Sequence, residues 1–177
     1  MSKAKIATVW LDGCSGCHMS FLDIDERLLT VAELADLVYS PLVDAKEFPE
    51  MVDVTLIEGA VSNKEDYEKI KKVRAHTKIL VSLGDCAVTA NVPGMRNLFG
   101  PKPVLERAYL ENAQHNQHIP VQVIPPLLDK SVPVHNVVDV DVFVPGCPPS
   151  ADTIFYVLTE LLNGRIPDVS GKTYFGV

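Results

Sequence analysis

The sequence lacks any uninterrupted apolar run of the 18 to 20 residues or so that a bilayer-spanning helix needs. Basic residues are also scarce: 16 Lys and Arg stand against 23 Asp and Glu, for a net charge of -7. Nucleic-acid binding needs a basic stripe to neutralise phosphates, so this composition argues against it. No twin-arginine signal or cleavable leader pattern opens the chain. We therefore expect a cytoplasmic protein that contacts neither membrane nor nucleic acid.

Internal repeats and the dinucleotide-binding pattern G-x-G-x-x-G are also missing, so we expect no NAD site in this chain. Hydrophobic residues nevertheless make up 47% of the 177 residues, which is enough to build a sizeable core. This length suits a single domain, and we assign residues 1–177 to one.

Short apolar segments alternate with helical patterns along the chain. Strands are expected at 5–11, 36–42, 53–57, 78–83 and 141–144, and helices at 17–34, 64–76 and 151–163. Asn63 and Ser150 fit helix N-caps, and Gly164 fits the position after a helix end. In the proline-rich segment 87–139 we expect only a helix near 104–113 and a short strand near 121–124. This alternation predicts an α/β fold: a flavodoxin-like, mostly parallel sheet with helices on both faces.

The chain has four cysteines, and each follows a predicted strand. Cys14 and Cys17 follow the first strand, Cys86 the fourth and Cys147 the last. Because the carboxyl ends of parallel strands lie along one edge, the topology brings all four thiols to that edge. Glycines accompany them at positions 13, 16, 84 and 146, and glycine lets the backbone approach a bulky group closely.

Four thiolates are what a [4Fe-4S] cluster requires, one for each iron, and this is the interpretation we favour. Three alternatives stay open. A structural zinc site also takes four cysteines, although two short C-x-x-C pairs are more typical of it. A thioredoxin-like pair would use Cys14 and Cys17 and leave the other two unexplained. The four could also be unrelated buried cysteines. Disulfides are not expected where cytosolic thiols stay reduced.

The motifs around these cysteines resemble those of [NiFe]-hydrogenase small subunits. The matching segments are 10–20 (WLDGCSGCHMS), 58–60 (EGA), 84–87 (GDCA) and 145–149 (PGCPP), which are spaced along the whole chain. The resemblance implies a flavodoxin-like domain that binds the proximal [4Fe-4S] cluster through Cys14, Cys17, Cys86 and Cys147. It places the nickel–iron site in a large subunit, and hydrogen is activated there.

One difference from many members of that family points to a particular subgroup. Many members add a C-terminal domain with medial and distal clusters, but this sequence has no cysteine after Cys147. The short form resembles the small subunit of soluble NAD-reducing hydrogenases, which implies diaphorase partners carrying iron–sulfur clusters, FMN and the NAD site. The reaction implied is H2 + NAD+ = NADH + H+. The related subunit of NADH:quinone oxidoreductase is the second candidate, but its first motif has adjacent cysteines.

Several other residues could serve the site. Glu58 follows the third strand on the cysteine edge, where it could relay protons or hold the large-subunit interface; a helix-capping or solvated glutamate is the alternative.

We expect Asp12 and Asp85 to make turn hydrogen bonds and not to take part in the reaction. We expect His18 to make hydrogen bonds or interface contacts, and Trp10 to pack beneath the cysteine loop. His115 and His118 fit an exposed polar stretch. The resemblance leaves room for FMN here, but the first βα turn is already committed to cysteines.

Overall fold

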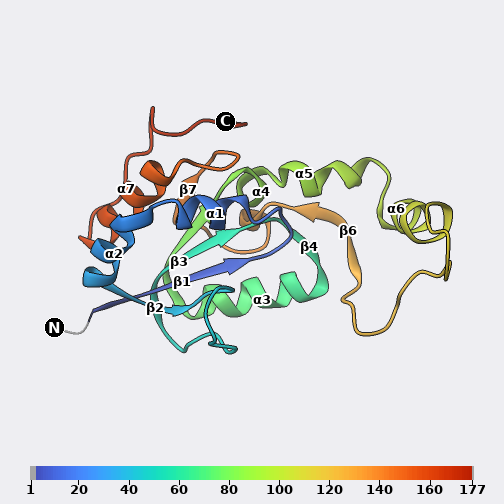
Figure 1. The fold of residues 1–177 in the computed structure, drawn as a ribbon, viewed down its shortest axis with the longest axis horizontal. Coiled ribbons are helices and arrows are strands. Elements are labelled where there is room, and N and C mark those ends of the chain that lie inside the picture. The colour runs from blue at the N-terminus through green and yellow to red at the C-terminus, as the bar shows by residue number, and fades with distance from the viewer. Residues whose placement is uncertain (1–2, 177) are drawn as a thin grey trace.

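The computed structural model describes residues 3–176 and has a central sheet of five parallel strands (Figure 1). The strands are β1 (Ala4–Trp10), β2 (Ala35–Tyr39), β3 (Val52–Glu58), β5 (Thr77–Leu83) and β7 (Val142–Val144). They are ordered β2-β1-β3-β5-β7. Counted along the chain, these five strands have the order 2-1-3-4-5, which is the flavodoxin-like arrangement. The predicted fold class and all five predicted strands are confirmed, with ends that differ by no more than three residues.

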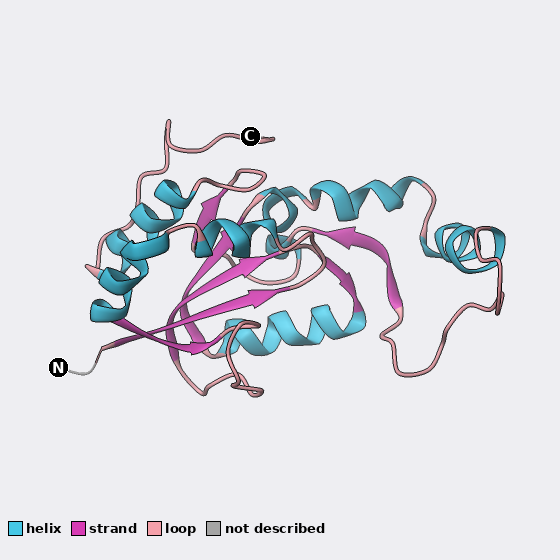
Figure 2. Cartoon of the chain, viewed as in Figure 1, coloured by secondary structure: helices cyan, strands magenta, loops and turns pink. Residues whose placement is uncertain are grey.

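Helices cover both faces of this sheet, as Figure 2 shows. One face carries α1 (Gly16–Leu22), α2 (Leu28–Leu34) and α7 (Ala151–Leu162), and the other carries α3 (Lys64–Ala75) and α4 (Asp85–Thr89). Successive strand residues point to opposite faces, so Leu56 joins the first core while Ile57 joins the second. Because both faces are buried, the strands are almost continuously apolar in sequence.

The expected helix over 17–34 is wrong in one respect, because it is broken into two. Helix α1 ends at Leu22, a short 3-10 turn (η1) spans Asp25–Arg27, and α2 follows. Asp25 has a φ of 59°, the left-handed conformation that aspartate tolerates better than most residues. The break redirects the chain so that Ile24 and Val31 both reach the core, where they are 1% and 3% exposed.

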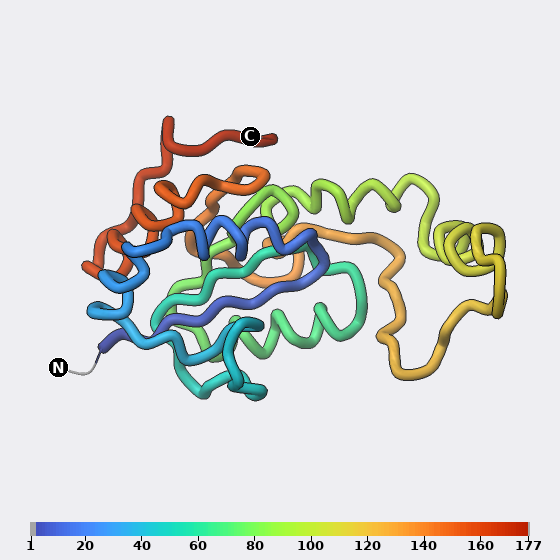
Figure 3. Tube along the Cα trace, viewed as in Figure 1, coloured from blue at the N-terminus to red at the C-terminus, as the bar shows by residue number. Residues whose placement is uncertain are grey.

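The proline-rich middle forms a segment that projects from the sheet (Figure 3). It contains α5 (Asn91–Gly94), η2 (Met95–Leu98), α6 (Pro101–Glu106), a π-turn η3 (Arg107–Glu111) and, after the return, η4 (Val134–Asn136). The helix expected near 104–113 is confirmed in part. A small antiparallel pair, β4 (Val61–Asn63) with β6 (Leu127–Val132), joins this segment to the domain.

The strand expected near 121–124 is wrong. Val123 has a φ of 73° and is fully exposed, so no sheet hydrogen bonding organises it. Prolines 125 and 126 have no N–H to donate, and pairing begins only after them, at Leu127 opposite Asn63.

Helix α3 is capped as the sequence predicts. The side-chain oxygen of Asn63 accepts a hydrogen bond from Asp66 N at 2.9 Å, and the amide of Asn63 donates to Asp66 Oδ2 at 2.7 Å. We expect Asn63→Ala to lower the free energy of unfolding by about 1 kcal/mol, because the helix loses this partner for its first turn. Urea unfolding measures the change. The control Asn112→Ala alters an exposed asparagine away from any helix N-terminus and should leave stability unchanged.

Ser150 likewise caps α7 by accepting from Thr153 N at 3.2 Å, and Gly164 adopts the left-handed conformation after it. Across residues 3–176, the longest apolar helices fall short of what a bilayer crossing requires.

Candidate metal centre

The four cysteines lie in three loops at the carboxyl edge of the sheet. Cys14 lies in the turn from β1 into α1, Cys17 in the first turn of α1, Cys86 in the first turn of α4 after β5, and Cys147 in the loop after β7. Cys17 and Cys86 are partly buried, whereas Cys14 and Cys147 are exposed, and none of the four is in a disulfide. The strands that carry these loops are parallel members of one sheet, which places the thiols at a common edge.

Gly84 marks the closest approach between two of these loops. A Cβ atom built on Gly84 would lie 2.2 Å from Cys17 Sγ, closer than any real contact, and 3.5 Å from Gly146 O. The Gly84 φ of 82° is also one that glycine adopts easily. A side chain at Gly16 would meet Cys14 Sγ at 3.2 Å. These two glycines therefore keep space free around the sulfur atoms.

Hydrogen bonds, most of them buried, tie the three loops together. Asp85 N donates to Gly146 O at 2.8 Å, and Gly146 N donates to Asp85 Oδ1 at 2.7 Å. The Ser20 hydroxyl in α1 donates to Pro149 O at 2.6 Å, which links the first cysteine loop to the last. Asn91 Nδ2 at the start of α5 donates to Cys147 Sγ at 3.6 Å. The cysteine loops are thus held in place by contacts between residues distant in sequence.

Electrostatics at this edge disfavour free thiolates. Burial raises the pKa of Cys17 well above its usual range, and the charges of Glu58, Cys86, Cys14 and Cys147 raise it further. Burial also raises the pKa of Cys86 to about 11, with Cys14 and Cys147 adding to the effect. The neighbouring cysteines therefore make ionisation of the Cys17 and Cys86 thiols harder. A bound cation would displace the thiol protons, because a coordinating thiol is deprotonated by the metal charge.

Glu58, the last residue of β3, is buried and points under the first cysteine loop. Its Oε2 accepts a hydrogen bond from His18 N at 2.7 Å and lies 2.7 Å from His18 Nδ1. His18 Nε2 lies 2.9 Å from Thr8 Oγ1, and the Thr8 hydroxyl donates to Ser40 Oγ at 2.8 Å. The carboxylate therefore does cap a helix, α1, while the alternative of a solvated glutamate is wrong. The hydrogen-bonding role expected for His18 is confirmed.

The remaining residues singled out in the sequence have simpler settings. Trp10 meets the His18 ring edge-on with centroids 5.3 Å apart, so it packs beside the first helical turn of the cysteine loop and stays 39% exposed. The turn hydrogen bond expected for Asp85 is wrong, because its carboxylate accepts from Gly146 N, 61 residues further along the chain. Asp12 pairs with Ala60 through its backbone. His115 and His118 lie in an exposed polar stretch, as expected. Within residues 3–176, no three His, Cys, Asp or Glu side chains are placed to hold a single metal ion.

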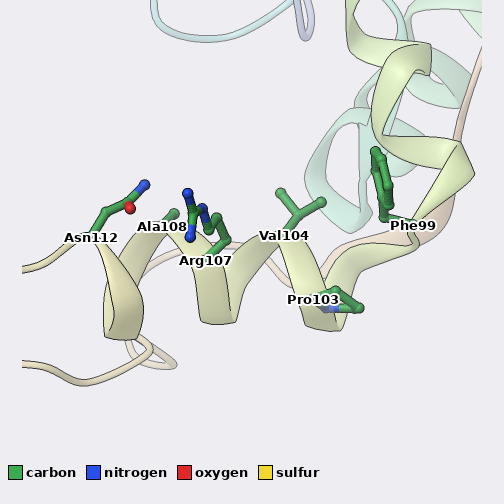
Figure 4. Close-up of a pocket in the computed structure, with 6 residues that line it drawn as sticks. All are labelled: Phe99, Pro103, Val104, Arg107, Ala108 and Asn112. Carbon is green, nitrogen blue, oxygen red and sulfur yellow. The ribbon is translucent and has the colours of Figure 1, made fainter.

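The projecting segment carries an apolar groove (Figure 4). Phe99, Pro103, Val104, Arg107, Ala108 and Asn112 line it. It contains none of the predicted site residues.

Sequence reasoning missed Thr8, Ser40, Ser20 and Asn91 as parts of the site. Only Thr8 gave a signal, as a hydroxyl within the otherwise apolar strand 5–11 that is 2% exposed in the structure. The other three lie in ordinary helix or loop contexts, and their partners are too distant in sequence for local patterns to reveal.

The fold is α/β, and the comparisons with known proteins identify the class as a subunit of an oxidoreductase complex. A family model described as NADH ubiquinone oxidoreductase, 20 Kd subunit matches residues 14–161, and the chain belongs to this family. The match runs from the first cysteine to near the end of α7.

Among relatives in this family, the delta subunit of the NAD-reducing hydrogenase HoxS of Cupriavidus necator is 45% identical over 92% of this chain and 80% of that protein. A subunit of the F420-non-reducing hydrogenase of Methanothermobacter marburgensis is 44% identical, and the match spans 92% of this chain but only 54% of that protein. These relatives confirm the resemblance to hydrogenase small subunits and the expected class, a subunit of an oxidoreductase complex.

Solved structures of hydrogenase chains are also similar to this chain. A chain of an NAD+-reducing [NiFe]-hydrogenase in the H2-reduced state superposes with a TM-score of 0.89 at 42% identity, over 94% of this chain and 95% of that one. A chain of the [NiFeSe]-hydrogenase of Dm. baculatum superposes with a TM-score of 0.60 at 18% identity, over 95% of this chain and 67% of that one, which is a likeness of fold.

Proposed function

We propose that this chain is the small electron-transfer subunit of a [NiFe]-hydrogenase, with residues 1–177 forming one domain around a single [4Fe-4S] cluster. Cys14, Cys17, Cys86 and Cys147 would be its ligands. The observation that carries the proposal is the gathering of these four thiols at one sheet edge, in loops joined by buried hydrogen bonds.

The donor set suits such a cluster. Each of the four irons takes one thiolate, so the sulfurs stand around a volume rather than a point. A single zinc ion would need four sulfurs about 2.3 Å from one position, which is a tighter arrangement. The absence of side chains at Gly84 and Gly16 leaves room beside Cys17 and Cys14, where a Cβ would approach the sulfur atoms.

When bound, the cluster would supply one-electron transfer. The chain's own residues would hold it, partly exclude water through the burial of Cys17 and Cys86, and orient the loops through Asp85 and Ser20. Hydrogen activation at a nickel–iron site, FMN and NAD binding belong in this proposal to partner subunits: a large hydrogenase subunit and a diaphorase module. The net reaction would be H2 + NAD+ = NADH + H+, in the cytoplasm.

The partner assignment draws on the relatives. The two relatives compared with this chain are subunits of hydrogenases, one named as NAD-reducing and one as F420-non-reducing. The identity of 45% and the 80% coverage of the HoxS delta subunit favour the NAD-reducing type.

The family description favours a second candidate, a cluster-bearing subunit of an NADH:quinone oxidoreductase-like complex. The spacing of Cys14 and Cys17, with two residues between them, weighs against it, because adjacent cysteines characterise the first motif of that subunit. Nickel in a partner subunit would separate the two candidates, because only the hydrogenase requires it.

Metal analysis of the anaerobically purified complex tests the proposal. We expect about four irons and four acid-labile sulfides attributable to this chain, with nickel in a larger partner. One equivalent of zinc without sulfide would instead identify a structural zinc protein. Iron and sulfide without nickel would favour the quinone-reductase-like complex.

A further inference from the structure

A hydrogen-bonded row of four buried polar side chains lies beneath the first cysteine loop. Glu58, His18, Thr8 and Ser40 are each 2% exposed, and hydrogen bonds of 2.7 to 2.9 Å join them in that order. Buried charged and polar groups are costly unless they are fully paired. Their burial inside an apolar β-sheet therefore points to a role that hydrophobic side chains would not fulfil.

The contact between Glu58 and His18 lies in the first turn of helix α1. Ser15 precedes the helix in a left-handed conformation with a φ of 65°, and its side chain makes no capping hydrogen bond. The N–H groups of a first helical turn need acceptors from elsewhere. Glu58 Oε2 supplies one from strand β3 by accepting from His18 N. Because Cys17 immediately precedes His18, this carboxylate fixes the backbone that carries a predicted ligand.

The imidazole ring adds three further constraints to the same residue. Nδ1 faces Glu58, Nε2 faces Thr8, and the ring edge packs on Trp10. These contacts hold His18 from two strands at once, β1 and β3. On the other side of the loop, Cys17 Sγ lies against Gly84. The Cys17 thiol is therefore held between the fixed His18 and the glycine of the next cysteine loop.

The Glu58 carboxylate also lies against the first cysteine loop. A Cβ built on Gly13, the residue before Cys14, would lie 3.7 Å from Glu58 Oε1. A negative charge near a cluster opposes the arrival of an electron, and hydrogen bonding and net charge are among the factors that set cluster potentials.

We propose that Glu58 and His18 are a positioning pair, which orients the Cys14–Cys17 loop through their hydrogen bonds, and that removing the Glu58 carboxylate raises the reduction potential of the cluster. This inference rests on the proposed function, and it gives Glu58 a role other than proton relay or subunit contact.

Glu58→Gln is the decisive variant, because the amide oxygen can still accept from His18 N while the charge is lost. In the intact complex we expect iron and sulfide content equal to wild type and a midpoint potential shifted upward in a redox titration followed by EPR. The matched control is Glu68→Gln, which alters an exposed glutamate of α3 and should leave the potential unchanged. An unchanged or lowered potential at full cluster content in Glu58→Gln would overturn the charge effect.

Two replacements of His18 test the positioning effect. Asparagine places its amide near the position of Nδ1 and keeps the Glu58 contact, whereas glutamine reaches the position of Nε2 and keeps only the Thr8 contact. We expect His18→Asn to retain most of the cluster and the wild-type EPR line shape, and His18→Gln to lose cluster by about tenfold. Equal behaviour of the two variants would overturn the role of the Glu58 link. His76→Asn, at the C-cap of α3, is the control.

The wild-type complex is measured in parallel. If it holds no iron and sulfide, the proposed function fails. If it holds them and the Glu58 and His18 variants match it in content, potential and line shape, only the positioning inference fails.

Discussion

Gly84→Ala is expected to abolish cluster binding while leaving a folded chain of reduced stability. The new Cβ would lie 2.2 Å from Cys17 Sγ, so this sulfur would have to leave its position, by rotation of the side chain or by movement of the first cysteine loop. Gly84 also has φ 82° and ψ 160°, a backbone region that only glycine populates readily, and alanine there costs about 1–3 kcal/mol. Iron and sulfide content per chain, together with urea unfolding, measures both effects.

Gly100→Ala provides a matched control. Gly100 has nearly the same backbone conformation, with φ 78° and ψ 172°, but a Cβ there would meet nothing within 4 Å. It should therefore show the same cost of about 1–3 kcal/mol from backbone strain with normal cluster content. If Gly84→Ala keeps as much cluster as Gly100→Ala, the free space between Gly84 and Cys17 is not required for cluster binding.

Asp85→Ala should have the second largest effect. The buried Asp85 carboxylate accepts from Gly146 N at 2.7 Å and from Gly176 N at 2.6 Å, so it joins the loops of Cys86 and Cys147 and holds the C-terminal segment. Its removal leaves the buried Gly146 N–H without this partner. We expect a loss of about 3 kcal/mol in the free energy of unfolding and faster loss of iron in the presence of a chelator.

Asp85→Asn refines this test. An amide keeps one acceptor but presents an NH2 group to the second N–H, so its effect should be intermediate. The exposed Asp168 also accepts a backbone hydrogen bond, from Ser170 N at 2.9 Å, and Asp168→Ala should leave iron retention unchanged. Identical iron loss in Asp85→Ala and Asp168→Ala would contradict the role of Asp85 in joining the cysteine loops.

The sequence by itself determined the sheet and the gathering of the cysteines. Short apolar strands alternating with helices leave few topologies, and a parallel sheet places every strand's carboxyl end at one edge. The turn after each strand is a local feature, and so is a cysteine within it. Cys14, Cys17, Cys86 and Cys147 could therefore be predicted to lie at one edge without knowledge of a single contact. Helix caps such as Asn63 and Ser150 were equally predictable, because the capping hydrogen bond reaches only three residues along the chain.

Only the tertiary structure decided how the site is held. His18 and Glu58 are 40 residues apart, and the pairing depends on β1 and β3 lying side by side in a fixed register. The approach of Gly84 to Cys17, the link from Ser20 to Pro149 and the pairing of β4 with β6 have the same origin. Such contacts form between segments that are neighbours in space and not in sequence. Local sequence propensity therefore cannot predict them. It favoured a strand at 121–124, where the structure has none.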